Sequence, residues 1–144
     1  MADLVIQEID AQSPYLEKVQ KLADANSATL GFLPYQAFNE YARQKAILAA
    51  LVDNTLAGYL IYRFVRRENK VIIVHLCVDQ TYRGKGVADQ LFSSLKGRTQ
   101  LSKGIGLHCR RDYKEASQLW ARLGFVPQHD KQGRRQSKPS ELTY

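Results

Sequence analysis

Residues 71–95 read VIIVHLCVDQTYRGKGVADQLFSSL, and this stretch decides the fold of the 144-residue chain. Val71–Val78 is an apolar, β-branched run with the composition of a buried strand. Leu91 and Leu95 belong to an apolar pattern with helical spacing, which predicts an amphipathic helix after the strand. The turn between the two, Arg83–Ala88, therefore lies at the N-terminus of a helix.

This turn has the composition of an anion site. The first N–H groups of a helix have no intrahelical partners and lie at the positive end of the macrodipole. Gly84 and Gly86 leave the backbone open to a phosphate, and Arg83 and Lys85 add positive charge. The spacing is not that of a P-loop, and Asp89 stands where a dinucleotide fingerprint needs a small residue. The alternative is a solvated turn in which the glycines only relax the helix start.

The turn resembles the acyl-CoA-binding motif of the GNAT acyltransferase superfamily, Arg/Gln-x-x-Gly-x-Gly/Ala, through Arg83, Gly86 and Ala88. Leu119–Phe125 resembles the later helix of that family, which ends in Gly-Phe. The resemblance is clearest over residues 71–125. More faintly, the sequence resembles GNAT modules that are fused to PIN-type nuclease domains.

The resemblance implies an α/β (α+β) GNAT fold, with a mixed, mostly antiparallel sheet that splays between its central strands and is flanked by helices. The expected order agrees: strand, two helices, three antiparallel strands, helix, strand, helix, strand. We expect one domain over residues 1–144, in which residues 129–144 form a polar basic loop and a stunted or truncated final strand. The first helix is predicted from an N-cap at Ser13 and a first helical residue at Pro14 to about Ala28. The other predicted elements are a short helix around Phe38, strands at Ile47–Val52, Leu56–Val65, Val71–Val78 and Ile105–Cys109, a helix at Glu115–Leu123, and a strand from Phe125.

The resemblance also implies acetyl-CoA as the co-substrate and no metal. The backbone of the strand end would pair with the pantetheine arm, and the turn would hold the pyrophosphate. The predicted cofactor-binding residues are Leu76, Cys77, Val78, Arg83, Gly84, Lys85, Gly86, Val87, Ala88, Tyr113 and Trp120. The alternative for the first three is that they are only core residues of a strand.

His75 is the predicted catalytic base. It interrupts an apolar strand near the place where the family often has an acidic residue, and an imidazole can accept a proton near neutral pH. The alternative is a half-buried histidine whose polar atoms are satisfied by the protein. His108, on a later strand, is a second candidate.

The chain departs from the family at a second catalytic position. The family pattern Asn-x-x-Ala-x-x-Leu-Tyr is met at Ala116 and Leu119, but Tyr113 replaces its Asn and Trp120 replaces its Tyr. That Tyr is the family's usual general acid toward the CoA sulfur, and Trp has no acidic proton to give. Tyr113 or water is therefore the predicted substitute.

Charge is unevenly distributed along the chain. Residues 1–60 have four Lys/Arg and seven Asp/Glu, a balance of −3, whereas residues 61–144 have seventeen and seven, a balance of +10. The basic half could attract a polyanionic cofactor or a nucleic acid, and the asymmetry does not choose between them. The apolar runs are strand-sized and the N-terminus has no signal-peptide pattern, so we expect a cytoplasmic protein with no membrane partner.

The leading hypothesis is an acetyl-CoA-dependent N-acetyltransferase that moves an acetyl group to a primary amine of an unknown acceptor by direct transfer. One alternative is a catalytically weak CoA-binding module, which the residues at 113 and 120 suggest. Another is a basic domain that binds nucleic acid or protein on the same fold. A homodimer and a missing C-terminal domain are also left open.

Overall fold

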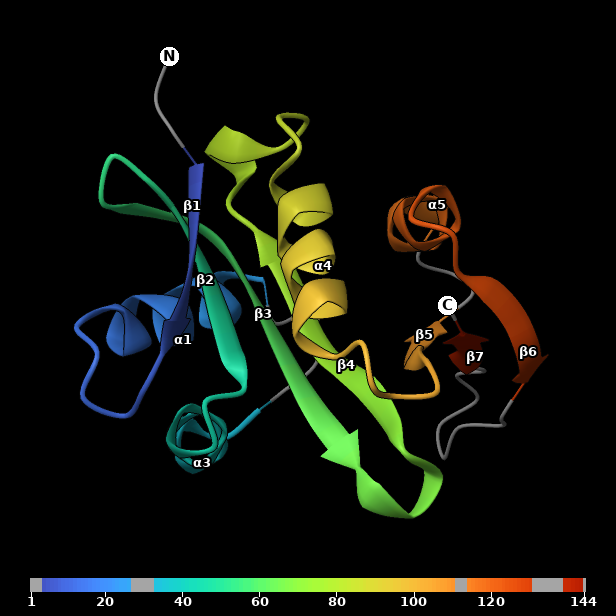
Figure 1. Cartoon of the computed structure of the whole chain (residues 1–144). Coiled ribbons are helices and arrows are strands. Elements are labelled where there is room, and N and C mark those ends of the chain that lie inside the picture. The colour runs from blue at the N-terminus through green and yellow to red at the C-terminus, as the bar shows by residue number, and fades with distance from the viewer. Residues whose placement is uncertain (1–3, 27–32, 111–113, 131–138, 144) are drawn as a thin grey trace. The chain divides into compact units, whose positions relative to one another are not determined.

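The computed structural model describes residues 4–26, 33–110, 114–130 and 139–143, with backbone alone at 108–110, 114–117, 126–130 and 139–143. Seven strands form a sheet in the order β1-β2-β3-β4-β5-β7-β6 (Figure 1). The elements are β1 (Leu4–Ile9), α1 (Tyr15–Ala25), α3 (Tyr35–Arg43), β2 (Ile47–Val52), β3 (Thr55–Val65), the 3-10 turn η1 (Arg66–Glu68), β4 (Lys70–Val78), the 3-10 turn η2 (Gln80–Tyr82), α4 (Val87–Arg98), β5 (Ile105–Arg110), α5 (Lys114–Arg122), β6 (Val126–Asp130) and β7 (Pro139–Thr143).

The chain divides into two compact parts. The first contains Met1–Arg63 and Val74–Gln100, and the second contains Phe64–Ile73 and Leu101–Tyr144. Strand β4 contributes its C-terminal half to the first part and its N-terminal half to the second.

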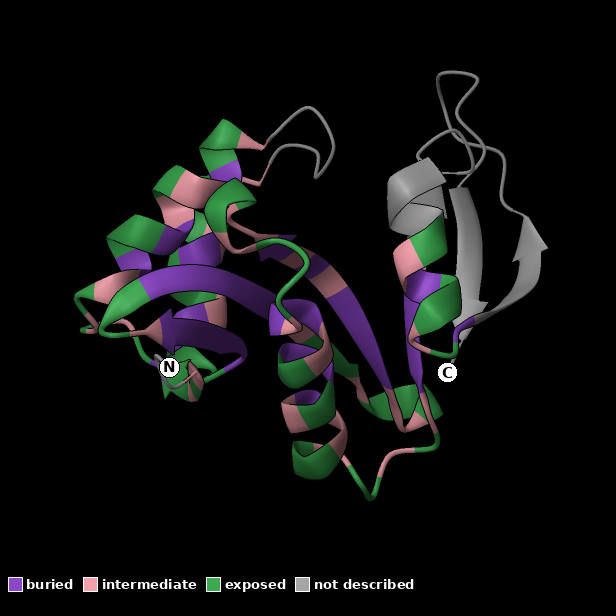
Figure 2. Ribbon diagram, turned by 90° about the horizontal axis from the view of Figure 1, so that it is seen from above, coloured by how far each residue is buried: buried purple, intermediate pink, exposed green. Residues whose placement is uncertain are grey.

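The first part has helices on both faces of its strands. β1 pairs with β2, and β2 pairs with β3, both antiparallel. In β2, Ile47, Ala49 and Leu51 belong to a core cluster that also contains Val19 of α1 and Phe38 of α3. Helix α4 covers the opposite face (Figure 2). Both faces of β2 are therefore buried, which explains its continuous apolar sequence.

A β-bulge in β3 lies close to the end of β4. Ala50 of β2 faces Gly58 of β3, but the next residue, Leu51, faces Leu56, so Ala57 is an extra residue in β3. The carbonyl of Ala57 accepts a hydrogen bond of 2.8 Å from the backbone N–H of Asp79. The bulge thus anchors the chain just beyond β4, where the glycine turn begins.

The first helix begins one residue later than the sequence predicted. Pro14 is the N-cap of α1, and Tyr15 is its first residue. Ser13 still acts near the helix start, because its Oγ accepts a hydrogen bond of 3.2 Å from the Tyr15 N–H. The helix ends at Ala25 with Asn26 as its C-cap, so it is shorter than the predicted helix to about Ala28, of which residues 27 and 28 lie outside the described ranges.

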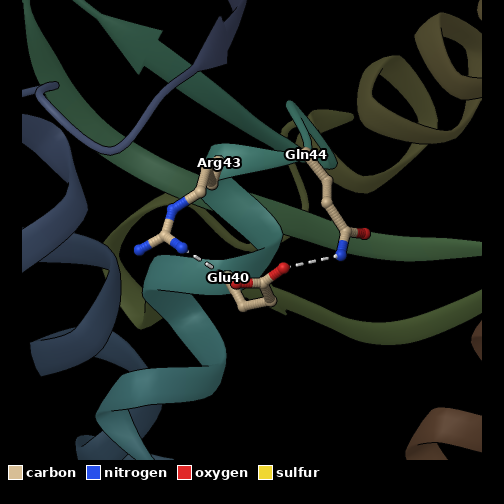
Figure 3. Close-up of polar contacts among 3 residues, drawn as sticks. All are labelled: Glu40, Arg43 and Gln44. Atoms are coloured by element: carbon tan, nitrogen blue, oxygen red, sulfur yellow. Dashed lines mark hydrogen bonds and ion pairs between the residues drawn. The ribbon is translucent and has the colours of Figure 1, made fainter.

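The short second helix, α3, is confirmed around Phe38, which is buried. Its last turn is supported by one acidic side chain (Figure 3). Glu40 Oε2 lies 3.4 Å from Arg43 Nη1, and Glu40 Oε1 accepts a hydrogen bond of 3.2 Å from Gln44 Nε2. Exposed contacts of this spacing each contribute about 0.2–0.5 kcal/mol to a helix.

The second part contains the strands that follow α4. Val71–Ile73 of β4 pair in parallel with Ile105–Leu107 of β5, and β7 pairs antiparallel with both β5 and β6. The sheet is thus mixed and mostly antiparallel, as predicted. The expected splay between its central strands stays a prediction.

The C-terminal strands correct the sequence prediction. β6 continues to Asp130 and β7 already begins at Pro139, so strands take up both ends of residues 129–144, where a polar basic loop and only a stunted or truncated final strand were predicted. β7 also lies between β5 and β6, so it is not an edge strand. Pairing on both sides gives its backbone N–H and C=O groups partners whatever its side chains are, which is why a polar segment can form this strand.

Candidate functional site

The glycine turn starts from a fixed chain end. After β4, Asp79 Oδ1 accepts a hydrogen bond of 2.9 Å from the Thr81 N–H, at the start of η2. Because the backbone N–H of Asp79 also donates a hydrogen bond to the Ala57 carbonyl, both the side chain and the main chain of Asp79 are fixed by hydrogen bonds. The turn that follows is therefore positioned by β3 as well as by β4.

The two glycines of the turn have backbone conformations that other residues rarely adopt. Gly84 has φ of +77°, and Gly86, the N-cap of α4, has φ of +82°. A Cβ placed on either glycine would find nothing within 4 Å. The backbone of the turn is thus open on the side that a side chain would otherwise occupy.

The first amides of α4 can receive an anion. The first i to i−4 hydrogen bond of the helix runs from the Gln90 N–H to the Gly86 carbonyl, at 3.0 Å. The N–H groups of Val87 and Ala88 precede it and, as the first amides of the helix, have no acceptor one turn earlier inside it. Val87 and Ala88 are themselves buried, which fixes the start of α4 against the core.

The side chain of Arg83 stabilises the turn through two hydrogen bonds. Its Nε donates to the Val78 carbonyl and its Nη2 donates to Asn26 Oδ1, both at 3.2 Å. Asn26 is the C-cap of α1, so the guanidinium connects the end of β4 to the end of that helix. Lys85 is exposed, with its Nζ 5.7 Å from the centre of the Tyr82 ring. Arg83 is thus fixed by two hydrogen bonds, whereas Lys85 makes a longer cation–π contact.

We expect Arg83 and Asn26 to stabilise the fold jointly. Arg83→Ala and Asn26→Ala should each lower the free energy of unfolding, and the double variant should lose about 0.5 kcal/mol less than the sum of the two. The shared hydrogen bond is already gone in either single variant, which is the reason for the difference. Urea denaturation of the four proteins measures this coupling. Additive losses would show that the contact contributes nothing.

Gly58 of β3 permits a close approach between three elements. A Cβ at this position would lie 2.7 Å from the Cys77 carbonyl oxygen, 3.2 Å from Val78 Cα and 3.2 Å from Val87 Cγ1. The end of β4 and the start of α4 can meet β3 here only because residue 58 has no side chain. Gly58 was not among the predicted site residues. Its one signal is a glycine inside an apolar strand, which often marks a close backbone approach.

Among the three predicted pantetheine contacts on β4, Leu76 and Val78 are partly exposed and Cys77 is buried. Burial raises the pKa of the Cys77 thiol to about 11, while the charge of Arg83 opposes this rise and that of Asp79 adds to it. The thiol is therefore protonated at neutral pH. Contacts of these residues with a cofactor stay a prediction.

We expect the Cys77 thiol to make stability depend on pH in the alkaline range. Its pKa is raised from 9.0 to about 11 on folding, so above pH 9 the unfolded chain loses this proton first. The free energy of unfolding should then fall between pH 9 and 11, by up to about 1.4 kcal/mol per pH unit. Cys77→Ala removes this contribution, so denaturation of both proteins across that range gives the difference. Equal slopes would contradict the buried, protonated thiol.

His75 is more buried than the sequence suggested. It is 6% exposed, and its Nδ1 lies 3.2 Å from the hydroxyl oxygen of Tyr59. The ring of Phe38 packs edge-on at 6.3 Å between centres, and burial lowers the pKa of His75 below its usual value. Tyr59 was not among the predicted site residues. The tautomer of the ring determines which nitrogen can accept a proton, and the role of His75 as a base stays a prediction.

A protein-family model matches the part of the chain that contains the glycine turn. The family model described as Acetyltransferase (GNAT) family matches residues 14–125, which include α1, the glycine turn and α5. The chain belongs to the GNAT acetyltransferase family. No curated protein sequence matches this chain.

The structure of this GNAT domain has the same fold as several solved structures. Ard1 from Thermoplasma volcanium has a TM-score of 0.84 and 17% identity, and the match covers 98% of this chain and 96% of that one. The NatC complex bound to Gag peptide and CoA has a chain with a TM-score of 0.83, 18% identity, and coverage of 98% and 97%. The ribosomal-protein-S18-alanine N-acetyltransferase from Escherichia coli has a TM-score of 0.80, 13% identity, and coverage of 98% and 92%. The GNAT fold predicted from the sequence is confirmed.

The two departures from the GNAT pattern lie in the second part of the chain. Trp120 of α5 is 7% exposed, and its ring packs edge-on against Phe125 at 5.3 Å between centres. The Phe125 N–H also donates to the Trp120 carbonyl at 2.9 Å. Trp120 is thus a packing residue of this part, and its contact with a cofactor stays a prediction. Tyr113 and the side chain of His108 lie outside what the structure describes.

The described residues contain no group of three or more His, Cys, Asp and Glu side chains arranged to hold a metal ion. None of their helices combines the length and the apolar character that crossing a membrane requires.

Proposed function

We propose that this GNAT domain transfers an acetyl group from acetyl-CoA to a primary amine by direct transfer. The open glycine turn carries the proposal. Gly84 and Gly86 leave its backbone uncovered, and the amides of Val87 and Ala88 lie at the positive end of α4. A diphosphate suits such a helix start, because N–H donors and the macrodipole both favour negative charge there.

The residues of this chain would bind acetyl-CoA, orient its acetyl group toward the amine, and exchange protons with the reacting groups. Acetyl-CoA supplies the acetyl group as an activated thioester. Transfer forms a bond between the amine nitrogen and the acetyl carbon, breaks the bond from that carbon to sulfur, and moves one proton from the amine to the thiolate. We propose that the turn holds the pyrophosphate and that the backbone of Leu76–Val78 orients the pantetheine arm. His75 and Tyr113 are the side chains proposed to act near the reacting atoms.

The first acceptor to test is the N-terminal amine of a peptide. Among the similar structures, one is named as an alanine N-acetyltransferase of a ribosomal protein and another was solved with a peptide and CoA. These proteins share less than 20% identity with this chain, so they support only a choice of starting substrate. The cytoplasmic location, a homodimer and a fused PIN-type domain stay predictions alongside it.

A binding and turnover experiment tests the proposal. The chain is heated with acetyl-CoA, with CoA, or with a generic oligonucleotide, and a ligand at 100 times its dissociation constant should add about 2.7 kcal/mol to stability. Acetylation of peptide and polyamine amines is then followed by mass spectrometry. We expect stabilisation by acetyl-CoA together with amine acetylation.

The other outcomes separate the alternatives. Stabilisation by acetyl-CoA without acetylation of any amine would favour the catalytically weak CoA-binding module. Stabilisation by the oligonucleotide alone would favour a nucleic-acid-binding domain, which the charge of +10 on residues 61–144 also allows.

A further inference from the structure

Tyr59 and His75 form a buried polar pair next to the strand end that the proposed function uses. Tyr59 is on β3 and His75 is on β4, with the phenol oxygen 3.2 Å from Nδ1 of the imidazole. Tyr59 is 0% exposed and His75 is 6% exposed. His75 immediately precedes Leu76, the first residue proposed to orient the pantetheine arm.

The burial of Tyr59 sets the direction of the hydrogen bond. Burial raises the pKa of the phenol, and Cys77, once its thiol ionises, and the charge of Asp24 raise it further, so the hydroxyl keeps its proton. A buried hydroxyl proton needs an acceptor, since leaving it unpaired is costly. Among the described residues, the acceptor within reach is His75 Nδ1. The hydroxyl therefore donates, and Nδ1 holds a lone pair.

The other ring nitrogen then carries the ring proton. A neutral imidazole has one N–H, so a lone pair on Nδ1 places the hydrogen on Nε2. Burial lowers the pKa of His75 and so favours this neutral ring. The hydrogen bond of His75 to a described residue is made by Nδ1, not by Nε2. No described side-chain nitrogen or oxygen is both fully buried and without a hydrogen-bond partner, so Nε2 stays in contact with solvent. The accessible nitrogen of His75 is thus a donor.

We propose that Tyr59 fixes His75 as the Nε2–H tautomer, so that His75 acts as a hydrogen-bond donor instead of the base that the sequence predicted. Tyr59 is then a positioning residue. A fixed N–H group suits an oxygen that gains negative charge during acyl transfer. The amine proton would leave through water. The catalytic consequence rests on the proposed function, whereas the tautomer does not.

Nitrogen NMR tests the tautomer without any substrate. In ¹⁵N-labelled protein, the His75 ring signals are those missing from His75→Gln. We expect one proton on Nε2 in the neutral ring, and a lone-pair Nδ1 signal that moves in Tyr59→Phe because its hydrogen bond is lost. A neutral ring with its proton on Nδ1 would overturn the proposal, as would an Nδ1 signal that Tyr59→Phe leaves in place.

A pair of His75 variants tests the donor role in turnover. His75→Leu has no donor, and we expect its kcat to fall about 100-fold, the effect of removing one donor to a developing oxyanion. His75→Gln keeps an N–H donor and an oxygen that can accept from Tyr59, but it cannot act as a base. We expect the kcat of His75→Gln to be at least about tenfold higher than that of His75→Leu. We also expect His75→Gln to keep the acidic limb of the wild-type pH profile.

The opposite pattern is that of a base. If His75→Gln is as slow as His75→Leu and the acidic limb disappears or moves, the donor role is wrong. Thermal unfolding of each variant shows whether it is folded. Should the wild-type chain acetylate no amine, the proposed function fails, while the NMR result still decides the tautomer.

Discussion

Gly86→Val is expected to weaken acetyl-CoA binding about 100-fold, or about 2.7 kcal/mol. Gly86 is the N-cap of α4 with φ of +82°, a conformation that a β-branched residue adopts only with strain. The added side chain would also enter the open space beside the backbone amides, where we place the pyrophosphate. Isothermal titration calorimetry with acetyl-CoA measures the effect directly.

Two variants serve as controls for Gly86→Val. Lys85→Ala removes an exposed cation two residues from the helix start, and we expect a loss of about threefold or less, because exposed charges contribute little. Gly97→Ala lies in the same helix with no atom within 4 Å of its new Cβ, so it should leave binding unchanged and stabilise α4 by up to about 1 kcal/mol. Equal, small losses in Gly86→Val and Lys85→Ala would place the cofactor elsewhere.

Gly58→Ala is expected to destabilise the fold by about 1–3 kcal/mol, the usual cost of overpacking. The new methyl group would lie 2.7 Å from a backbone oxygen, that of Cys77, which cannot rotate away as a side chain would. β4 or α4 must therefore shift. Chemical denaturation gives the loss, and the proposed site should also bind acetyl-CoA more weakly because Val87 contacts the same position.

Gly97→Ala is again the matched control, since it adds the same methyl group where nothing opposes it. If Gly58→Ala were as stable as this control and bound acetyl-CoA as tightly as the wild type, the close packing of β3 against the end of β4 would not constrain the site. A stable Gly58→Ala variant with weakened acetyl-CoA binding would instead show that the shift is confined to the turn.

The sequence by itself determined the central strand, the glycine turn and α4. These are local features: the apolar run of β4, the helical spacing of Leu91 and Leu95, and glycines where φ is positive are all specified within about 25 residues. The GNAT motif lies in the same stretch, and the family and its fold were therefore within reach of sequence analysis. The short second helix was predicted for the same reason, from the spacing around Phe38.

Only the tertiary structure decided which distant residues meet. Tyr59 and His75 are 16 residues apart, and Asn26 and Arg83 are 57 apart. Their contacts depend on strand order, register and the bulge at Ala57, which shifts the pairing between β2 and β3. β7 likewise became an interior strand because β5 and β6 offer its backbone partners on both sides. A hydrogen bond between distant residues needs both groups in place, and the spacing of residues along the chain does not specify that placement.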